Sequence, residues 1–239
     1  MKTNSLRMRG KIAALAIALC GGCAFHGHGG TVVAGTSGGT WFLPFAISAD
    51  GTAHYTSRYQ QIYTGTFFPV ASVITRIGFM SVSTLPPGNI TYDLSIAFGT
   101  TARMPSAPGT EFVSGATPVF SGSVLASLTP AAGDFDFSIN LSTPFLYDPA
   151  AGNLLLEVTV ISATGTPGTG LSGAFGADFG EPGMGILFVG KAPVESNAHL
   201  GLVTQFTTAP VPEPGVAGLA LAGGVLSFGR IRSARGWAR

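Results

Sequence analysis

The chain has 239 residues, of which 10% are charged, and a formal net charge of +1. The near-neutral total hides an uneven distribution: residues 25–211 hold four basic residues and ten acidic ones, a net charge of −6, and the other eight basic residues lie at the two ends. Nucleic-acid binding requires clustered Lys and Arg side chains that neutralise phosphates. The middle of the chain has no such cluster, which excludes a nucleic-acid-binding domain.

Residues 1–24 have the order of a secretory signal peptide. An apolar segment at residues 12–20 follows four basic residues, which are Lys2, Arg7, Arg9 and Lys11. Small residues come next, so we expect export through the Sec machinery and cleavage after Ala24. Lipidation of Cys23 is an alternative, although Cys20 stands where an aliphatic residue is required. Cleavage after Ala24 removes both cysteines, so the mature protein is expected to have no disulfide and to depend on its apolar core.

Residues 25–39 are rich in glycine, and we expect them to form a mobile arm before a single domain at residues 40–208. Within this domain, short β-prone runs alternate with Gly, Pro and Ser at intervals of about ten residues, as in sandwiches and barrels. The expected strands are residues 41–47, 54–63, 72–82, 90–98, 118–128, 135–141, 154–161, 171–179, 186–189 and 199–207.

Several of these runs alternate between apolar and polar residues. Tyr92, Leu94, Ile96 and Phe98 share one face of their expected strand. One buried and one solvated face is typical of antiparallel sheets. The segment 154–160 is apolar except for Glu157 and is expected to be a central strand. We therefore predict an all-β fold, an antiparallel β-sandwich of jelly-roll type.

Two short motifs suggest catalysis or nucleotide binding, but their context does not fit. Gly35-Thr36-Ser37-Gly38-Gly39 has the G-x-S-x-G spacing of serine hydrolases, which requires a strand before the serine and a helix after it. Glycine-rich chain precedes this motif, and no helix signal follows. Gly168, Gly170 and Gly173 have the dinucleotide-binding spacing, again with no helix after them. We therefore expect no catalytic residue.

Candidate binding residues are few. His26 and His28 could chelate copper near a new N-terminus, and Asp134 and Asp136 could bind calcium with a loop carbonyl. In each case solvated polar residues are the simpler interpretation, so we predict no metal site and no cofactor. Tyr55, Tyr59 and Tyr63 fall on one face of an expected strand, where they would form either a sugar-stacking platform or part of the core. His54 and His199 are isolated in the sequence.

The last part of the chain combines three features in a fixed order. Pro212, Glu213 and Pro214 come first, and an apolar run of 14 residues at 215–228 follows. Basic residues then end the chain: Arg230, Arg232, Arg235 and Arg239. A bilayer-spanning helix needs about 20 residues, so this run is short for a permanent anchor. The order is typical of an address signal, with the arginines on the cytoplasmic side.

The segment 209–239 resembles the PEP-CTERM sorting signal of Gram-negative bacteria. The resemblance implies that the apolar run is a short transmembrane helix that holds the exported protein in the inner membrane. It also implies that an exosortase, a membrane-embedded cysteine protease, removes the tail. Proteins with this signal are typically made by bacteria that secrete exopolysaccharide. The arginines are spread along the chain here, whereas the family has a compact run.

Three segments of the middle, residues 57–63, 144–158 and 201–206, resemble uncharacterised secreted bacterial proteins that carry the same tail. This resemblance implies shared architecture and no particular activity. We therefore expect an exported, non-catalytic protein of the cell surface or extracellular matrix, transiently anchored in the membrane and associated with exopolysaccharide. The alternatives are a carbohydrate-active enzyme and a calcium- or glycan-binding module.

Overall fold

The computed structural model describes residues 29–41, 43–47, 56–81, 88–128, 134–165, 175–180, 182–189 and 194–211. Apart from two single-turn 3-10 helices, η1 (Gly65–Phe67) and η2 (Pro149–Ala151), the regular structure of these residues is β. The strands are β1 (Gly30–Ala34), β2 (Gly39–Trp41), β3 (Arg58–Tyr63), β4 (Ser72–Phe79), β5 (Gly88–Thr101), β6 (Thr117–Leu128), β7 (Phe137–Tyr147), β8 (Asn153–Gly165), β9 (Phe175–Phe179), β10 (Met184–Val189), β11 (Glu195–Ala198), β12 (Leu200–Leu202) and β13 (Thr204–Pro210). No helix in the described ranges is long and apolar enough to cross a membrane.

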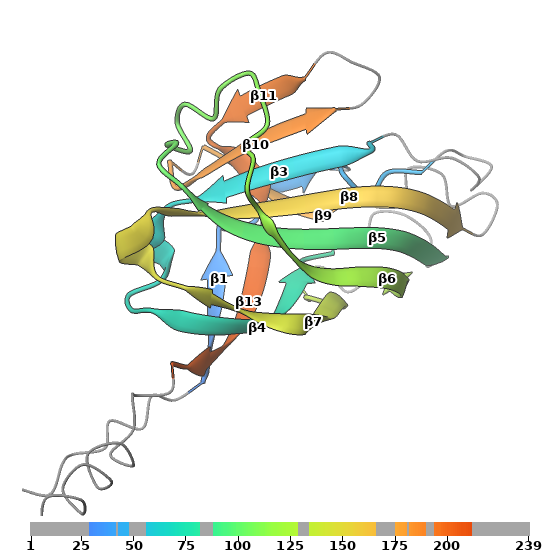
Figure 1. Ribbon diagram of the computed structural model, residues 1–239. Helices are drawn as coiled ribbons and strands as arrows, with labels where there is room; N and C mark the ends of the chain where they lie inside the picture. Colours follow the sequence, from blue (N-terminus) through green and yellow to red (C-terminus); the bar gives the residue numbers. More distant parts are fainter. Residues whose placement is uncertain are drawn as a thin grey trace, which may run out of the picture.

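The strands form three sheets, and every pairing between them is antiparallel. A six-stranded sheet in the order β11-β10-β3-β8-β5-β6 lies above a four-stranded sheet in the order β1-β13-β4-β7 (Figure 1). The third sheet has the order β12-β9-β2. One cluster of buried apolar side chains includes Phe79 from β4, Leu94 from β5 and Ala177 from β9. The described chain is therefore an all-β, sandwich-like domain, as the alternating pattern predicted.

Strand β5 shows how the pattern places the core. Its alternate residues are fully buried: Ile90, Tyr92, Leu94, Ile96 and Phe98. The residues between them, such as Thr91 and Asp93, lie on the outer face. A strand with period-two alternation buries one face and leaves the other in water, so its register is strongly specified.

The two opposed sheets contain ten strands, and β10 and β11 form one edge of the larger sheet. The other eight strands are β1, β3, β4, β5, β6, β7, β8 and β13. Counted in chain order, the four-stranded sheet runs first, eighth, third, sixth. The six-stranded sheet runs second, seventh, fourth, fifth, and β10 and β11 extend it beyond the second. The connections therefore pass repeatedly from one sheet to the other.

An aromatic cluster centred on Phe45 fills one part of the interior. The Phe45 ring meets four others edge-on at centroid distances of 5.0 to 5.5 Å, those of Phe79, Tyr92, Phe137 and Phe175. The Tyr92 hydroxyl donates a hydrogen bond to the Phe45 carbonyl oxygen at 2.6 Å. Edge-to-face pairs of this kind stabilise a core beyond their area burial.

A buried polar group lies between the sheets. The Gln61 amide acts like a strand backbone, because its Oε1 accepts from the Leu202 N–H and its Nε2 donates to the Leu202 carbonyl oxygen, each at 3.0 Å. The Tyr59 hydroxyl donates to the same Oε1. The Tyr63 hydroxyl bonds to Thr204 Oγ1 at 2.8 Å. Paired in this way, the buried polar atoms avoid the cost of desolvation without a partner.

The glycine-rich arm expected at residues 25–39 requires correction. In its described part, β1 pairs with β13 from Gly30↔Thr208 to Ala34↔Thr204, and Gly39 begins β2. Val32 packs against the core, so burial fixes this segment despite its glycines. Glycine lowers strand propensity, but pairing with a strand already in the sheet outweighs that local preference.

Other strand boundaries also differ from the expected ones. The strand expected at 41–47 ends at Trp41, and residues 43–45 form a turn, because Pro44 cannot donate to a ladder. β8 continues to Gly165 and β7 to Tyr147, and β13 ends at Pro210 rather than at residue 207. β11 was not expected, since all four of its residues are exposed and show no apolar alternation.

Candidate functional site

The outer face of the six-stranded sheet carries a linked group of polar side chains. Arg58 and Gln60 lie on β3 and Glu157 lies on β8, with Gln60 directly opposite Glu157 in the register. Side chains alternate along a strand, so Tyr59 and Gln61 face the interior while Arg58 and Gln60 face outward. The site therefore depends on a single sheet register.

The connection from β5 to β6, residues 102–116, crosses this face, and we call it the strap. Its apolar residues pack on three buried side chains of the sheet, forming a small cluster of Phe112, Val113 and Ala116 with Ile62, Leu155 and Leu187. Glycine is required where the strap crosses β10, because a Cβ on Gly185 would lie 2.1 Å from the Pro105 carbonyl oxygen. The strap thus forms a second, smaller core outside the sandwich.

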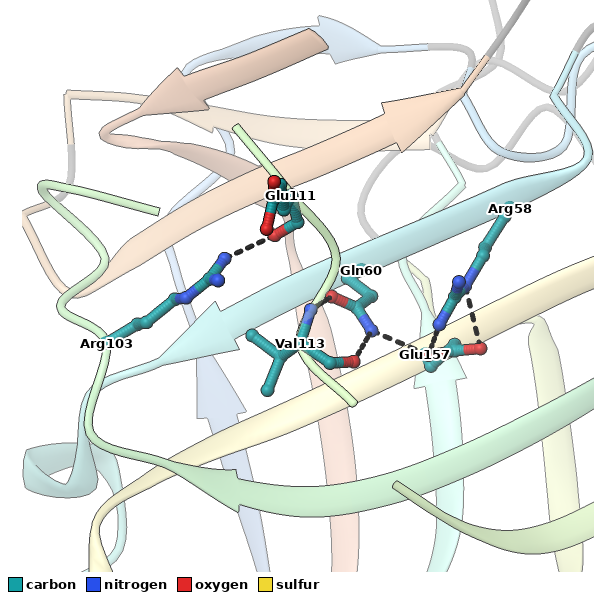
Figure 2. Close-up of polar contacts among 6 residues, drawn as sticks. All are labelled: Arg58, Gln60, Arg103, Glu111, Val113 and Glu157. Carbon is teal, nitrogen blue, oxygen red and sulfur yellow. Dashed lines mark hydrogen bonds and ion pairs between the residues drawn. The ribbon is translucent and has the colours of Figure 1, made fainter. Parts of the chain in front are cut away.

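Gln60 fastens the strap to the sheet (Figure 2). Its Oε1 accepts a hydrogen bond from the Val113 N–H at 2.8 Å, and its Nε2 donates to the Val113 carbonyl oxygen at 2.7 Å. The same Nε2 donates to Glu157 Oε2 at 2.6 Å. Gln60 has no exposed surface, so one amide satisfies both backbone groups of a strap residue in a buried setting.

Arg58 links Glu157 to the strap. Its Nε donates to Glu157 Oε1 at 3.0 Å and its Nη2 to Oε2 at 2.9 Å, a bidentate pair in which Glu157 is mostly buried. The guanidinium carbon lies 4.3 Å from the centroid of the Phe112 ring. Arg58 is therefore held between a carboxylate and an aromatic face, both of which attract its charge.

A second arginine shapes the strap from within. The Arg103 guanidinium donates to the carbonyl oxygen of Glu111 (Figure 2), and it also donates to that of Pro108. Gly109 between them has a φ of 89°, a conformation that glycine adopts readily. These bonds close the strap into a compact loop.

This geometry is that of a clamp. Both Glu157 oxygens accept hydrogen bonds, and their donors are a guanidinium and an amide. Glycoside hydrolysis uses two carboxyl groups about 5 to 9 Å apart across a cleft. Glu157 is instead committed to Arg58 and Gln60, which hold the strap on the sheet.

A shallow hollow of about 220 Å³ adjoins the strap. Its lining residues are uncharged: Thr64, Thr66, Met104, Pro105, Pro182 and Gly183. Small-molecule sites usually enclose about 300 to 1,000 Å³ and contain a few convergent polar groups. The hollow is smaller than that, so we assign it no ligand.

The serine-hydrolase motif forms the connection between β1 and β2. Asp178 on β9 accepts hydrogen bonds from the Thr36 N–H at 2.6 Å and from Thr36 Oγ1 at 2.9 Å. Gly35 has a φ of 90° at the turn. A strand, rather than the helix of a nucleophile elbow, follows Ser37. The buried Asp178 therefore stabilises the turn between β1 and β2.

Of the two interpretations of the tyrosines, the core is correct and the sugar-stacking platform is wrong for the two that the structure describes. Tyr59 and Tyr63 have no exposed surface. Burial raises the pKa of both hydroxyls well above the usual value, and the nearby Tyr63 raises that of Tyr59 further. Tyr55 lies outside the described residues, as does His54.

The structure also describes the acidic candidates Asp134 and Asp136 and the histidine His199. Asp134 and Asp136 precede β7, and the Asp134 carbonyl oxygen accepts from the Ser81 N–H at 2.9 Å. His199 joins β11 to β12 with a φ of 57°. Among the residues that the structure describes, no three His, Cys, Asp or Glu side chains are grouped as metal ligands.

Asp93 lies at the centre of a hydroxyl-rich part of the outer face, away from the strap. Ser123 on β6 and Ser162 on β8 both donate hydrogen bonds to its carboxylate. These two bonds lower the pKa of Asp93. Thr91 and Ser95 flank it on β5, and the exposed Leu125 on β6 lies opposite Thr91, so this part of the face is rich in hydroxyl groups and poor in charge.

Among the described residues, an exposed aromatic ring lies on the three-stranded sheet. Phe179 on β9 is 52% exposed, and its ring meets that of Trp41 on β2 edge-on at a centroid distance of 6.1 Å. A Cβ on Gly39 would lie 2.6 Å from the Phe179 ring, so the ring rests on glycine backbone. Exposed aromatic rings of this kind can stack on flat apolar ligand surfaces.

Several sequence-based candidates lie outside the described residues: Ala24, His26, His28, Gly168, Gly170, Gly173, Pro212, Glu213, Pro214, Arg230, Arg232 and Arg235. Sequence reasoning missed Gln60 and Phe112 as clamp residues. Glu157 is the sequence feature that could have indicated the clamp, since it is the one acidic residue in the apolar strand β8. A carboxylate there requires hydrogen-bond partners, but the sequence alone does not show which residues they are.

No protein-family model matches the chain, and a search of curated proteins finds no match.

Proposed function

We propose that this chain is an exported surface or extracellular-matrix protein whose C-terminal segment, residues 209–239, is a PEP-CTERM sorting signal. The signal peptide ends at Ala24 and directs export through the Sec machinery. The tail holds the protein transiently in the inner membrane until an exosortase cuts at Pro212-Glu213-Pro214. The β-domain is a non-catalytic element of the cell surface or matrix, associated with exopolysaccharide.

One observation carries this proposal: the two ends of the described domain lie side by side. β1 begins at Gly30 and pairs with β13, which ends at Pro210, two residues before Pro212. The first and last strands of the described chain therefore lie side by side (Figure 1). A domain attached in this way can be tethered and released without disturbing its core.

The strand order supports a jelly roll as the finer architecture. One sheet runs first, eighth, third, sixth and the other second, seventh, fourth, fifth. This is the order produced when eight antiparallel strands wind as two Greek keys. Jelly rolls are common in lectin and capsid domains, so the fold suits binding and assembly. It assigns no activity by itself.

A second candidate function, a carbohydrate-binding module, is favoured by Phe179. Its half-exposed ring beside Trp41 offers a stacking surface on the three-stranded sheet. The flat hydroxyl-rich face around Asp93 adds hydrogen-bonding groups on another side of the domain. Sugar recognition combines these two kinds of contact.

The sorting signal is tested by replacing Pro212, Glu213 and Pro214 with alanine in the producing bacterium. The variant is expected to accumulate as full-length precursor in the inner-membrane fraction, because the protease no longer recognises it. Pro210→Ala, two residues upstream, is the matched control and should be processed like the wild type. Release of the triple variant at the wild-type level would contradict the proposal.

A further inference from the structure

Strand β6 is an edge of the six-stranded sheet, and β7 of the four-stranded sheet lies near it without pairing with it. It has 12 residues, Thr117–Leu128, and β5 is its pairing partner within the described chain. None of the 12 residues is charged, and its proline, Pro118, stands at the second position. An edge strand presents unpaired backbone N–H and C=O groups to any strand that approaches.

The other sheet edges among the described residues are protected in ways that β6 is not. β11 has four residues and begins with Glu195, and β1 has five. β7 contains Pro144, and its register with β4 shifts between Ile74 and Arg76. β2 and β12 have three residues each. Short length, charge, proline and bulges are the means by which proteins prevent edge pairing. β6 has a proline and a bulge at its start, since its register with β5 skips Val119, but none of these features over residues 120–128.

The two faces of β6 have distinct chemistry. Ser121, Ser123 and Leu125 are exposed on the outer face, where they continue the hydroxyl-rich surface around Asp93. Phe120 and Val124 point inward and pack against the main core. A strand added at this edge must match both faces, with polar residues outside and apolar residues inside.

We infer that β6 pairs antiparallel with β6 of a second copy of this chain, about a two-fold axis, and joins the two six-stranded sheets into one. Directly opposed residues of an antiparallel pair lie on the same face. If the two-fold axis places one outer-face residue of β6 opposite the same residue of the second copy, every other outer-face residue of one copy also lies opposite an outer-face residue of the other. A second β6 therefore has the polar outer face and apolar inner face that the added strand needs. Because β6 has no charged residue, no like charges meet along the pair.

The net charge of the rest of the domain determines how self-association should depend on salt concentration. Residues 25–211 carry a net charge of −6, so two copies repel one another through the rest of the domain. Salt screens that repulsion and should strengthen the association. A partner of opposite charge would show the reverse dependence. This inference does not require the sorting signal, although tethering in a membrane would raise the effective concentration.

Cysteine cross-linking tests the contact directly. In the full chain with Cys20→Ser and Cys23→Ser, purified in mild detergent, Ser121→Cys, Ser123→Cys and Leu125→Cys are oxidised separately. The residue that faces itself across the axis should form a disulfide dimer at least about tenfold faster than Ser142→Cys, an exposed control on β7, since opposed Cα atoms lie about 5 Å apart. If none of the three exceeds the control, the inference is wrong.

Sedimentation of the full chain gives an independent test. Leu125→Lys places a charge on the open edge at a side chain that is 60% exposed, so folding should be unaffected. It should weaken self-association at least about tenfold, while Leu146→Lys on β7, at a residue 58% exposed, should not. Equal melting temperatures for the two variants would exclude unfolding as the cause. A wild-type chain that stays monomeric at all salt concentrations, or equal association of both variants, would overturn the inference.

Discussion

Phe45 and Phe179 have the same side chain in opposite surroundings. Phe45 is fully buried and touches four aromatic rings, whereas Phe179 is 52% exposed. Removing a buried phenylalanine costs about 3 to 5 kcal/mol, because apolar contacts are lost and a cavity remains. Removing a half-exposed one costs about 1 kcal/mol or less. Substitution of Phe45 therefore tests stability, whereas substitution of Phe179 tests binding with little effect on stability.

We predict that Phe45→Ala lowers the free energy of unfolding by about 3 to 5 kcal/mol, as measured by denaturant titration. Phe179→Ala should leave that free energy nearly unchanged and reduce retention on exopolysaccharide from the producing bacterium, as measured by affinity electrophoresis. Leu146→Ala, at a residue 58% exposed on β7, is the control for a general loss of apolar surface. Equal retention of Phe179→Ala and the control would argue against carbohydrate stacking at Phe179.

At the scale of single elements, the strap depends on one amide. Gln60 bonds both backbone groups of Val113 and one oxygen of Glu157. A hydrogen-bonding group left buried without a partner costs about 1 to 3 kcal/mol. The strap also retains the apolar contacts of Phe112 and the bonds made by Arg103, so it should loosen without detaching from the sheet.

We predict that Gln60→Met, which keeps the side-chain volume, speeds amide hydrogen exchange of residues 102–116 about tenfold or more. Exchange in β5 and β8 should change much less, because the sheet core is untouched. Gln205→Met on the four-stranded sheet is the control and should leave the strap protected. Unchanged exchange of the Val113 amide in Gln60→Met would show that apolar packing alone holds the strap.

Periodicity predicted the elements whose packing is local in the sequence. β5 was expected from Ile90 to Phe98, the central part of the observed strand Gly88–Thr101, because its alternate residues there are core. Gly30–Ala34 was expected to be mobile, since its place in the sheet depends on β13, which lies far away in the sequence. The same limit applies to the site. Glu157 stands out in the sequence, but the strap that brings Phe112 over Arg58 comes from another part of the chain.

For the whole molecule, the adjacent ends of the domain connect the fold with the proposed sorting. β1 and β13 are paired, so under this proposal one domain would be exported first and released later from the same side. The acidic domain between two basic ends fits this proposed order, because eight of the 12 basic residues belong to the segments that the proposal expects to be removed. The proposal therefore requires a mature protein shorter than the encoded chain at both ends.

Mass spectrometry of the protein recovered from outside the cell tests this requirement most directly. The account predicts an N-terminus close to residue 25 and a C-terminus close to Pro212-Glu213-Pro214, so that Arg230 and all residues after it are missing. Extracellular protein that still contains Trp237 would contradict it.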